Sequence, residues 1–223
     1  MSIERNGARA RRSGAILFVA AALLAFAGCF FQPRDPKDPD DNGNPNTEPA
    51  KSPEEVVEKL DLSFERFSRT QYEILLAEDF RFAPDRGDSS DLADAGHTPF
   101  AEPWGLIKED EVFGRLVSCF NDNTTRLGGI DLAYNGEQVW TDSSVTGYST
   151  FESGYDLWIK YVRLAPPTQE DSLAFGGSVK LSIRQDDDGA FRIYRWEDFR
   201  LGAVKSWGYY KGEVAASLSY CPE

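Results

Sequence analysis

Apolar side chains first recur at helical spacing shortly after residue 50. Residues 52–55, Ser-Pro-Glu-Glu, form a capping box in which Ser52 is the N-cap and Glu55 can reach back to it. The residues that follow carry one apolar stripe: Val57, Leu60, Phe64 and Phe67. The stripe stands against four polar residues: Glu58, Lys59, Glu65 and Arg66. This spacing predicts an amphipathic helix that begins at residue 53.

The next pattern changes from helical to alternating. A shorter helix is predicted around Tyr72, Leu75 and Leu76, followed by a strand in which Phe80 and Phe82 alternate with polar neighbours. Residues 84–103 are rich in Gly, Ser, Asp and Pro, and predict a loop longer than most connections, either a lid or an insertion. Helical spacing then returns over residues 109–120.

The rest of the chain alternates apolar and polar residues, which is typical of half-buried strands. Strands are predicted at residues 130–134 and 155–161. The clearest pair is residues 178–184 and 191–196, joined by a turn at Asp188-Gly189. Helices first and antiparallel strands afterwards predict an α+β domain with helices packed on one face of a sheet.

The N-terminus has the pattern of an export signal. Four arginines precede an apolar run at residues 15–27, which is shorter than the roughly 20 residues that span a bilayer. Residues 26–29, Phe-Ala-Gly-Cys, resemble the lipobox of bacterial lipoproteins. We therefore expect residues 1–28 to be a signal peptide cleaved after Gly28, and Cys29 to carry acyl chains such as palmitate. The alternative is an ordinary secretory signal followed by a chance cysteine.

The anchor predicts where the protein is found. Multiple acyl chains bind a membrane far more firmly than one, so the membrane itself would be a partner. Phe30, rather than aspartate, follows Cys29, which favours the bacterial outer membrane, on the side facing the periplasm. Residues 29–51 are dominated by Pro, Asp and Asn, and predict a disordered linker ahead of a single domain at residues 52–223.

The composition of the chain limits which partners, metals and cofactors are expected. The chain has 24 basic and 37 acidic residues, a net charge of -13, which argues against nucleic acid as a partner. Residues 38–43 resemble the start of a calcium loop, but Pro49 stands where the loop needs a bidentate glutamate, so no metal or cofactor is predicted. Cys119 and Cys221 could form a disulfide after export. The alternative is that Cys119 is a small helix residue and Cys221 an exposed thiol.

Several motifs occur in an order that resembles the nuclear transport factor 2-like superfamily, also called the cystatin-like or ketosteroid-isomerase-like cone fold. They are Ser-Pro-Glu-Glu at 52–55, Ala-Glu-Asp-Phe-Arg-Phe at 77–82, Trp104, Arg-Ile-Tyr-Arg-Trp-Glu-Asp at 192–198, and Ser-Trp-Gly at 206–208 with Lys211. The resemblance covers most of residues 52–211. It implies a curved antiparallel sheet wrapped around the first helix, a cone-shaped pocket, and in many members a homodimer formed through the sheet.

Catalytic members of this superfamily place a base carboxylate with tyrosine or protonated aspartate donors, or a His-Asp pair, inside the cone. We identify no such set, and the single histidine, His97, lies in the predicted loop, so no catalytic residue is assigned. Four residues are candidates for ligand binding, each with a structural role as its alternative: Tyr72, Trp196, Asp198 and Trp207. On a strand, Trp196 and Asp198 would share one face, with Glu197 on the other.

The sequence therefore favours a membrane-tethered, non-catalytic module whose cone or sheet face binds a small apolar molecule or another envelope protein. One alternative is an enzyme of isomerase or lyase type, which would need a buried carboxylate of raised pKa opposite a hydrogen-bond donor. Another is a structural component of an envelope assembly.

Overall fold

A computed structural model describes residues 48–119, 125–143, 147–164 and 167–216. These ranges do not include the predicted signal peptide, Cys29 or most of the linker, so the lipid anchor stays a prediction. Cys221 and the side chain of Cys119 also lie outside the described residues, so the disulfide stays a prediction as well. Among the helices of the described ranges, none combines the length and the apolar character needed to cross a bilayer.

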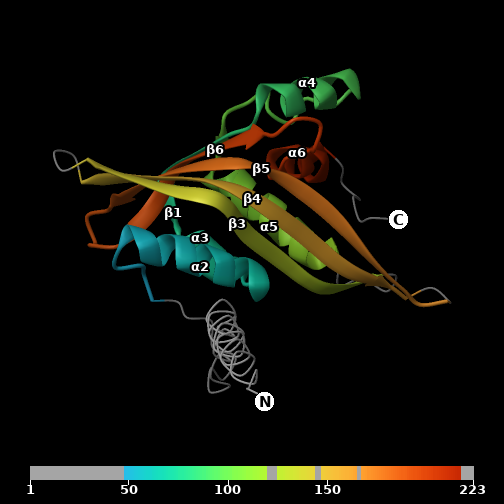
Figure 1. The fold of residues 1–223 in the computed structure, drawn as a ribbon, viewed down its shortest axis with the longest axis horizontal. Helices are drawn as coiled ribbons and strands as arrows, with labels where there is room; N and C mark the ends of the chain where they lie inside the picture. The colour runs from blue at the N-terminus through green and yellow to red at the C-terminus, as the bar shows by residue number, and fades with distance from the viewer. Residues whose placement is uncertain (1–47, 120–124, 144–146, 165–166, 217–223) are drawn as a thin grey trace, which may run out of the picture. The chain divides into compact units, whose positions relative to one another are not determined.

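The domain is α+β, as predicted (Figure 1). Its described helices are α2 (Pro53–Glu65), α3 (Arg69–Ile74), α4 (Arg86–Asp94), α5 (Leu106–Cys119) and α6 (Trp207–Ala216). Its strands are β1 (Leu76–Ala83), β2 (Trp104–Gly105), β3 (Thr125–Ser143), β4 (Tyr148–Arg163), β5 (Gln169–Gln185) and β6 (Phe191–Arg200). They form one curved, open sheet in the order β2-β1-β6-β5-β4-β3.

The sheet is mixed, which differs from the wholly antiparallel sheet expected. Strands β3, β4, β5 and β6 pair antiparallel, whereas β1 and β6 run parallel. The chain leaves β1 through α4, β2 and α5, starts again at the far edge with β3, and returns strand by strand. The last strand, β6, therefore arrives beside β1 in the same direction.

Helix α2 begins where the capping box predicts. Ser52 accepts a hydrogen bond from the backbone N–H of Glu55 at 3.3 Å, and the Glu55 carboxylate accepts one from the N–H of Lys51 at 2.7 Å. The chain joins the sheet slightly earlier than expected, because Ala50, assigned from the sequence to the linker, is 2 % exposed and bridges to Phe191.

The buried stripe of α2 shares Leu60 and Phe64 with the predicted one, whereas Val57 and Phe67 are only partly buried against the core. It consists of Val56, Lys59, Leu60, Ser63 and Phe64. Lys59, expected on the polar face, is buried because its ammonium donates to the Glu48 carbonyl at 2.6 Å and pairs with Glu55 at 3.0 Å. The aliphatic stem of Lys59 thereby covers apolar surface while its charge is compensated.

Two helices were not predicted. Helix α4 lies in the predicted loop at 84–103 and is capped by Asp85, which accepts from the N–H of Gly87 at 2.6 Å. Helix α6 has no polar face to reveal it, because it is covered on both sides. A Cβ at Gly212 would lie 2.4 Å from Leu92 of α4, and Trp207 packs into the core on the other side. A helix buried all round lacks the amphipathic period on which prediction depends.

The helices meet inside the curve of the sheet at one aromatic side chain, Phe64 of α2. Its ring makes edge-on contacts with the rings of Tyr72 at 5.7 Å, Phe113 at 5.6 Å and Trp207 at 5.7 Å. These partners come from α3, α5 and α6. Contacts of this geometry add to the stabilisation from buried area, so Phe64 joins four helices in one core.

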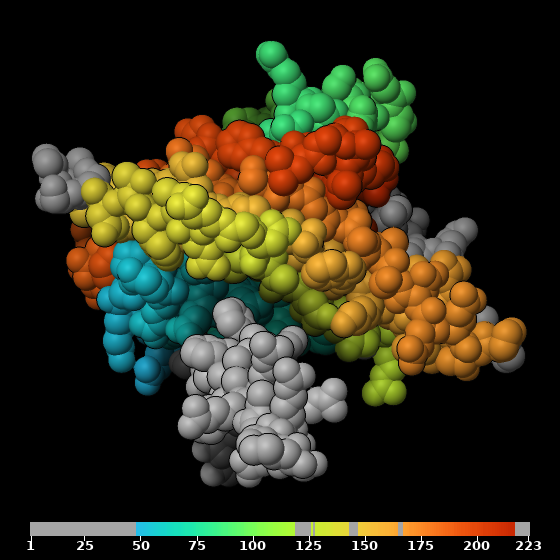
Figure 2. Space-filling view, in the orientation of Figure 1, coloured from blue at the N-terminus to red at the C-terminus, as the bar shows by residue number. Residues whose placement is uncertain are grey.

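Strands β4 and β5 are long, with 16 and 17 residues. At about 3.3 Å per residue, their hairpin extends about 50 Å. They pair from Tyr148↔Arg184 at one end to Arg163↔Gln169 at the other. Figure 2 shows β3, β4 and β5, coloured yellow to orange, forming a continuous face of the molecule.

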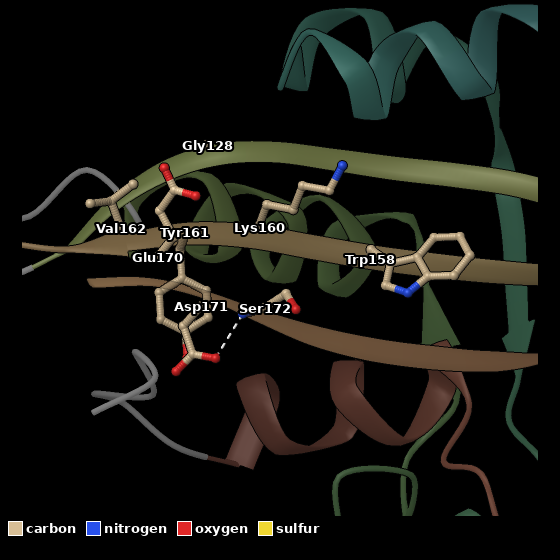
Figure 3. Close-up of a pocket in the computed structure, with 8 residues that line it drawn as sticks. All are labelled: Gly128, Trp158, Lys160, Tyr161, Val162, Glu170, Asp171 and Ser172. Atoms are coloured by element: carbon tan, nitrogen blue, oxygen red, sulfur yellow. Dashed lines mark hydrogen bonds between the residues drawn. The ribbon is translucent and has the colours of Figure 1, made fainter. Parts of the chain in front are cut away.

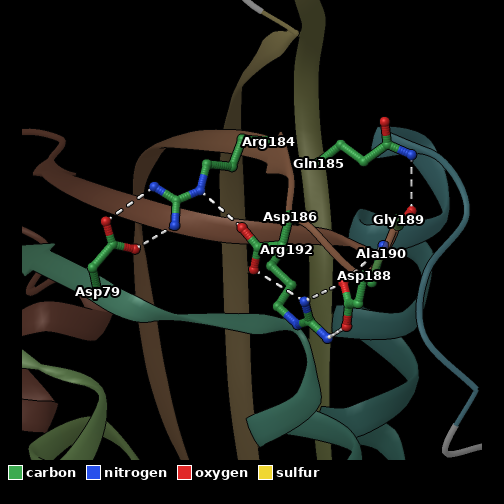
Figure 4. Close-up of polar contacts among 8 residues, drawn as sticks. All are labelled: Asp79, Arg184, Gln185, Asp186, Asp188, Gly189, Ala190 and Arg192. Carbon is green, nitrogen blue, oxygen red and sulfur yellow. Dashed lines mark hydrogen bonds and ion pairs between the residues drawn. The ribbon is translucent and has the colours of Figure 1, made fainter.

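A chain of ion pairs ties β1 to the β5–β6 hairpin (Figure 4). Arg184 forms two hydrogen bonds to Asp79, at 2.7 and 3.0 Å, and a third to Asp186 at 2.9 Å. Arg192 bonds to the other oxygen of Asp186 at 3.0 Å and to both oxygens of Asp188 at 2.6 and 2.9 Å. Paired guanidinium–carboxylate forks fix geometry as well as charge, so this network sets the register of the turn.

The ion-pair network should shift the pKa of Asp188. Hydrogen bonds from Arg192 and from the N–H of Ala190 lower the pKa of Asp188 to about 2. Its stabilising contribution is complete above the unfolded value of about 3.9 and is lost as the pH falls towards 2. In Arg192→Gln, carboxyl-detected NMR should show the pKa of Asp188 rising towards its ordinary value. In the control Arg195→Gln, which removes the ion-pair partner of Glu197 instead, the pKa of Asp188 should not change. An unchanged Asp188 in Arg192→Gln would contradict this assignment.

Candidate functional site

Seven polar or aromatic side chains from six segments meet inside the curve of the sheet and are named here the polar cluster. They are Tyr72, Trp104, Glu109, Tyr155, Asp198, Ser206 and Lys211. Each is at most 3 % exposed. Buried polar groups are costly unless they are paired, so the partners of each group decide what the cluster does.

Glu109 is the acceptor at one end of the cluster. One carboxylate oxygen accepts the Tyr72 hydroxyl and pairs with the Lys211 ammonium at 2.5 Å. The other oxygen accepts the indole N–H of Trp104 at 2.6 Å. Burial, and then the Glu109 charge, raise the pKa of Tyr72, so this phenol remains a hydrogen-bond donor.

Lys211 extends from α6 into an aromatic cage. Its nitrogen lies 4.0 Å from the ring centre of Phe82, 4.3 Å from that of Trp196 and 5.6 Å from that of Trp207. Burial lowers the pKa of Lys211, and the nearby Glu109 carboxylate opposes that shift. The cage and the Glu109 carboxylate, with a smaller contribution from the Asp198 charge, compensate an ammonium that water does not reach.

Asp198 holds the beginning of α6. Its Oδ1 accepts the Tyr155 hydroxyl at 2.7 Å, and its Oδ2 accepts the Ser206 hydroxyl at 2.8 Å and the N–H of Gly208 at 2.5 Å. A carboxylate at a helix N-terminus is favoured by the unpaired amides and by the helix dipole. Burial nevertheless raises the pKa of Asp198, against the lowering effect of these hydrogen bonds.

The contact between Asp198 and the start of α6 also accounts for the positions of Tyr155 and Gly208. Tyr155 accepts a hydrogen bond from the N–H of Trp207 at 2.8 Å while it donates to Asp198. A Cβ at Gly208 would lie 2.9 Å from the Asp198 carboxylate, so glycine allows the backbone to approach and donate. The first turn of α6 is therefore bonded to β4 and β6.

Little open space remains inside the cone. A cavity between α2 and the sheet is lined by Phe64, Leu132, Tyr134, Tyr155, Leu157, Val179 and Trp196. The volume open to the centre of a water molecule is about 10 Å³. This is room for about one water. The Tyr134 hydroxyl and the Trp196 indole N–H are buried there without a hydrogen-bond partner in the described residues.

The four ligand-binding candidates from the sequence do come together. Tyr72 and Asp198 belong to the polar cluster, Trp196 forms the cage and borders the cavity, and Trp207 packs against Phe64. Trp196 and Asp198 point to the same side of β6, as strand alternation predicts, and Glu197 is partly exposed. Whether any of them contacts a ligand stays a prediction.

No functional role is predicted from the sequence for Glu109, Lys211 or Tyr155. Lys211 carried a signal that could have been used, because it is a lone charge in the run Trp-Gly-Tyr-Tyr-Lys-Gly at residues 207–212. Glu109 was hidden by its position in the first turn of a helix, where acidic residues are common for local reasons. Within the described ranges, His, Cys, Asp and Glu side chains form no group of three that could hold a metal ion.

A second site lies along the long β4–β5 hairpin (Figure 3). It is a hollow of about 520 Å³, named here the outer hollow. Its lining consists of Gly128, Trp158, Lys160, Tyr161, Val162, Glu170, Asp171 and Ser172. Figure 3 shows Lys160 and Glu170 extending to the same side of β4 and β5, while Tyr161 and Asp171 extend to the other.

Comparison with solved structures finds similar folds. A nuclear transport factor 2-like superfamily protein from Salmonella enterica serovar Typhimurium is 11 % identical, with a TM-score of 0.45, over 67 % of this chain and 89 % of that one. A cystatin-like protein of unknown function from Nostoc punctiforme is 13 % identical, with a TM-score of 0.41, over 68 % and 90 %. A ketosteroid isomerase-like protein from Erwinia carotovora is 14 % identical, with a TM-score of 0.42, over 67 % and 93 %. No protein-family model and no curated protein sequence matches the chain.

Proposed function

We propose that this chain is a non-catalytic binding module, tethered to the bacterial envelope membrane through Cys29, that binds its ligand on the outer surface of the domain. The observation that carries the proposal is how the buried carboxylates are used. Every carboxylate oxygen of Glu109 and Asp198 accepts a bond from the chain itself. These bonds hold α6 in the cone.

The available space supports the same proposal. A general base must reach the proton that it abstracts, directly or through one water. Asp198 and Glu109 are each 1 % exposed, and the neighbouring cavity accepts about one water. The cone is thus occupied by the chain's own helix α6, whereas the hollow of about 520 Å³ lies along the β4–β5 hairpin.

One observation favours a second function. Asp198 is a buried carboxylate of raised pKa that faces the Tyr155 hydroxyl, which is the arrangement required of an isomerase-type site. For a substrate to reach the Asp198 carboxylate, the first turn of α6 would have to move away from it.

Amide hydrogen exchange separates the two functions. In the mature protein, the N–H groups of Trp207 and Gly208 should exchange only with global unfolding, because both donate to buried acceptors. The N–H of Ile107, whose side chain is 85 % exposed, provides a fast-exchanging reference. Exchange of Trp207 and Gly208 through a low-energy local opening would overturn the non-catalytic proposal and support the enzyme.

The anchor gives a direct prediction. Cells grown with labelled palmitate should incorporate the label into the wild-type chain and not into Cys29→Ser, because a serine cannot form the thioether that carries the diacylglycerol. The wild-type protein should fractionate with the outer membrane. Cys221→Ser is the matched control and should keep both label and location. Labelled Cys29→Ser, or soluble wild-type protein, would contradict the tether.

A further inference from the structure

The loop between β6 and α6 exposes a continuous run of apolar residues. Residues 201–204, Leu-Gly-Ala-Val, are all exposed, and the exposed fractions of Leu201 and Val204 are 55 % and 52 %. Phe199, near the end of β6, is 42 % exposed. Single exposed apolar residues are normal, whereas a run of four on the surface of a domain indicates a function. Residues 199–205 are named here the apolar loop.

The apolar loop has a defined shape, and its tip projects into solvent. The Arg200 guanidinium donates to the Gly202 carbonyl at 3.1 Å. At the other end of the loop, the Lys205 carbonyl accepts from the N–H of Gly176 on β5 at 3.1 Å. Gly202 has a φ of 66°, which glycine permits, and a Cβ built on it would meet no atom within 4 Å. The tip of the loop at Gly202 is therefore surrounded by open space.

Strand register places the loop beside other apolar groups on one side of the sheet. A Cβ on Gly176 would lie 3.6 Å from the Val204 side chain. Two residues earlier on β5, the exposed Ala174 pairs with Trp158, which is 36 % exposed. Side chains two residues apart on a strand point the same way, so Val204 and Trp158 share this side. Phe199 is paired with β5 in the same phase and shares it as well.

We propose that the apolar loop enters the surface of the membrane to which Cys29 tethers the chain, and thereby orients the domain on the bilayer. Leu201 and Val204 would lie among the upper acyl chains, with Trp158 nearer the lipid headgroups, where tryptophan is favoured. Lys205 ends the apolar run with a cation at the level of the lipid phosphates. This inference rests on the proposed tether and adds a second membrane contact to it.

The tether and the chemistry of the loop favour lipid over a protein partner. The predicted linker before Ala50 could extend over tens of ångströms at about 3 Å per residue, so the loop can reach the bilayer. A tether raises the effective concentration of the membrane at the domain, and a contact too weak to bind by itself then becomes sufficient. Residues 201–204 carry no side-chain hydrogen-bonding group that could select a protein, whereas lipid requires only apolar side chains.

The charges on this side of the sheet limit the membrane contact to the loop. Asp131 pairs with Lys160, and Asp156 accepts a hydrogen bond from the Asn135 amide at 2.7 Å. Both carboxylates lie on strands beside Trp158 and would lose water if the whole sheet entered lipid, which is costly. The net charge of -13 also disfavours close approach of the domain to an anionic surface. The contact is therefore made by the loop, with the sheet remaining in water.

Reporter tryptophans test the depth of the loop in the full lipidated chain, purified from membranes and reconstituted in phosphatidylcholine vesicles. Val204→Trp places an indole in the apolar loop. The matched control Ile107→Trp places one on α5, at an apolar residue that is 85 % exposed. Lipid brominated on the upper half of its acyl chain quenches only indoles in contact with it. Relative to wild type, the emission added by Val204→Trp should fall to about half or less, because side chains at the membrane boundary lie about 5 to 10 Å deep. The emission added by Ile107→Trp should not change.

A charge placed in the loop should reverse this result. Leu201→Asp in the Val204→Trp chain should restore the lost emission, with an unchanged unfolding midpoint because Leu201 is exposed. Equal quenching of both reporters, no quenching of Val204→Trp, or quenching that survives Leu201→Asp would each contradict the membrane contact. If Leu201→Asp instead converts a dimer to a monomer in sedimentation, the loop is an interface between copies and the inference is overturned.

Palmitate labelling of the same preparations keeps this inference distinguishable from the proposed function. A chain without label contradicts the tether itself. A labelled chain in which Val204→Trp is not quenched contradicts only the contact made by the loop, and leaves the tether and the non-catalytic proposal in place.

Discussion

Glu109→Gln should lower the free energy of unfolding by about 3 to 5 kcal/mol. The substitution preserves the size of the side chain but removes the carboxylate charge that pairs with the buried Lys211 ammonium at 2.5 Å in the wild type. Water cannot replace that partner, because Lys211 is fully buried. The measurement is urea unfolding followed by circular dichroism, with the slope of the transition checked for constancy.

Two variants control this experiment. Glu111→Gln changes the next glutamate on α5, whose exposed side chain pairs with Arg115, and should cost less than about 1 kcal/mol. The double variant Glu109→Gln with Lys211→Met removes both charges, and methionine can still fill the aromatic cage. It should be more stable than Glu109→Gln alone. If the double variant were destabilised by the sum of the effects of Glu109→Gln and Lys211→Met measured singly, the buried ion pair would not be the cause of the destabilisation.

Asp198→Asn should destabilise the domain by about 3 kcal/mol. The carboxylate accepts three hydrogen bonds, from Tyr155, Ser206 and the N–H of Gly208, and an amide group can accept at only one of its two ends. The amide nitrogen must then face at least one donor. The cost should be seen in urea unfolding and in faster exchange of the first amides of α6. Glu197→Gln, on the opposite side of the same strand, is the control and should have little effect.

The pH dependence of this second effect follows from the raised pKa of Asp198. The folded protein retains the Asp198 proton to higher pH than the unfolded chain, whose carboxyl titrates near about 3.9. The contribution of Asp198 to stability is therefore complete below that value and decreases as the pH rises through the folded pKa. The stability difference between wild type and Asp198→Asn should be larger at pH 4 than at pH 7. The reverse order would show that burial does not dominate at this carboxyl.

Local chemistry made part of this structure predictable. The capping box at Ser52 places the start of α2, and the Asp188-Gly189 turn places the β5–β6 hairpin, because both act within a few residues. Period-two alternation also predicts correctly that Trp196 and Asp198 share a face. Leu60 and Phe64 of the predicted α2 stripe are buried, but the burial of Lys59 was not predicted, because sequence patterns expect a solvated charge there.

The residues of the candidate sites are brought together by contacts between segments that lie far apart in the sequence. Local sequence patterns therefore do not predict these sites. Glu109 lies far along the chain from Lys211, and nothing in either local sequence specifies that they meet. The outer hollow likewise depends on strand register, which pairs Lys160 with Ser172 and Val162 with Glu170.

The sequence by itself predicts an export signal with a lipobox, a disordered linker and an α+β domain, because signal regions, composition and periodicity are properties of neighbouring residues. The structure confirms the α+β domain, and the export signal and linker stay predictions. The tertiary structure alone decided that β1 joins β6 in parallel, that α6 occupies the cone, and that two carboxylates and a lysine are buried there. Burial and pairing depend on which segments pack together, and that choice is made by the whole fold.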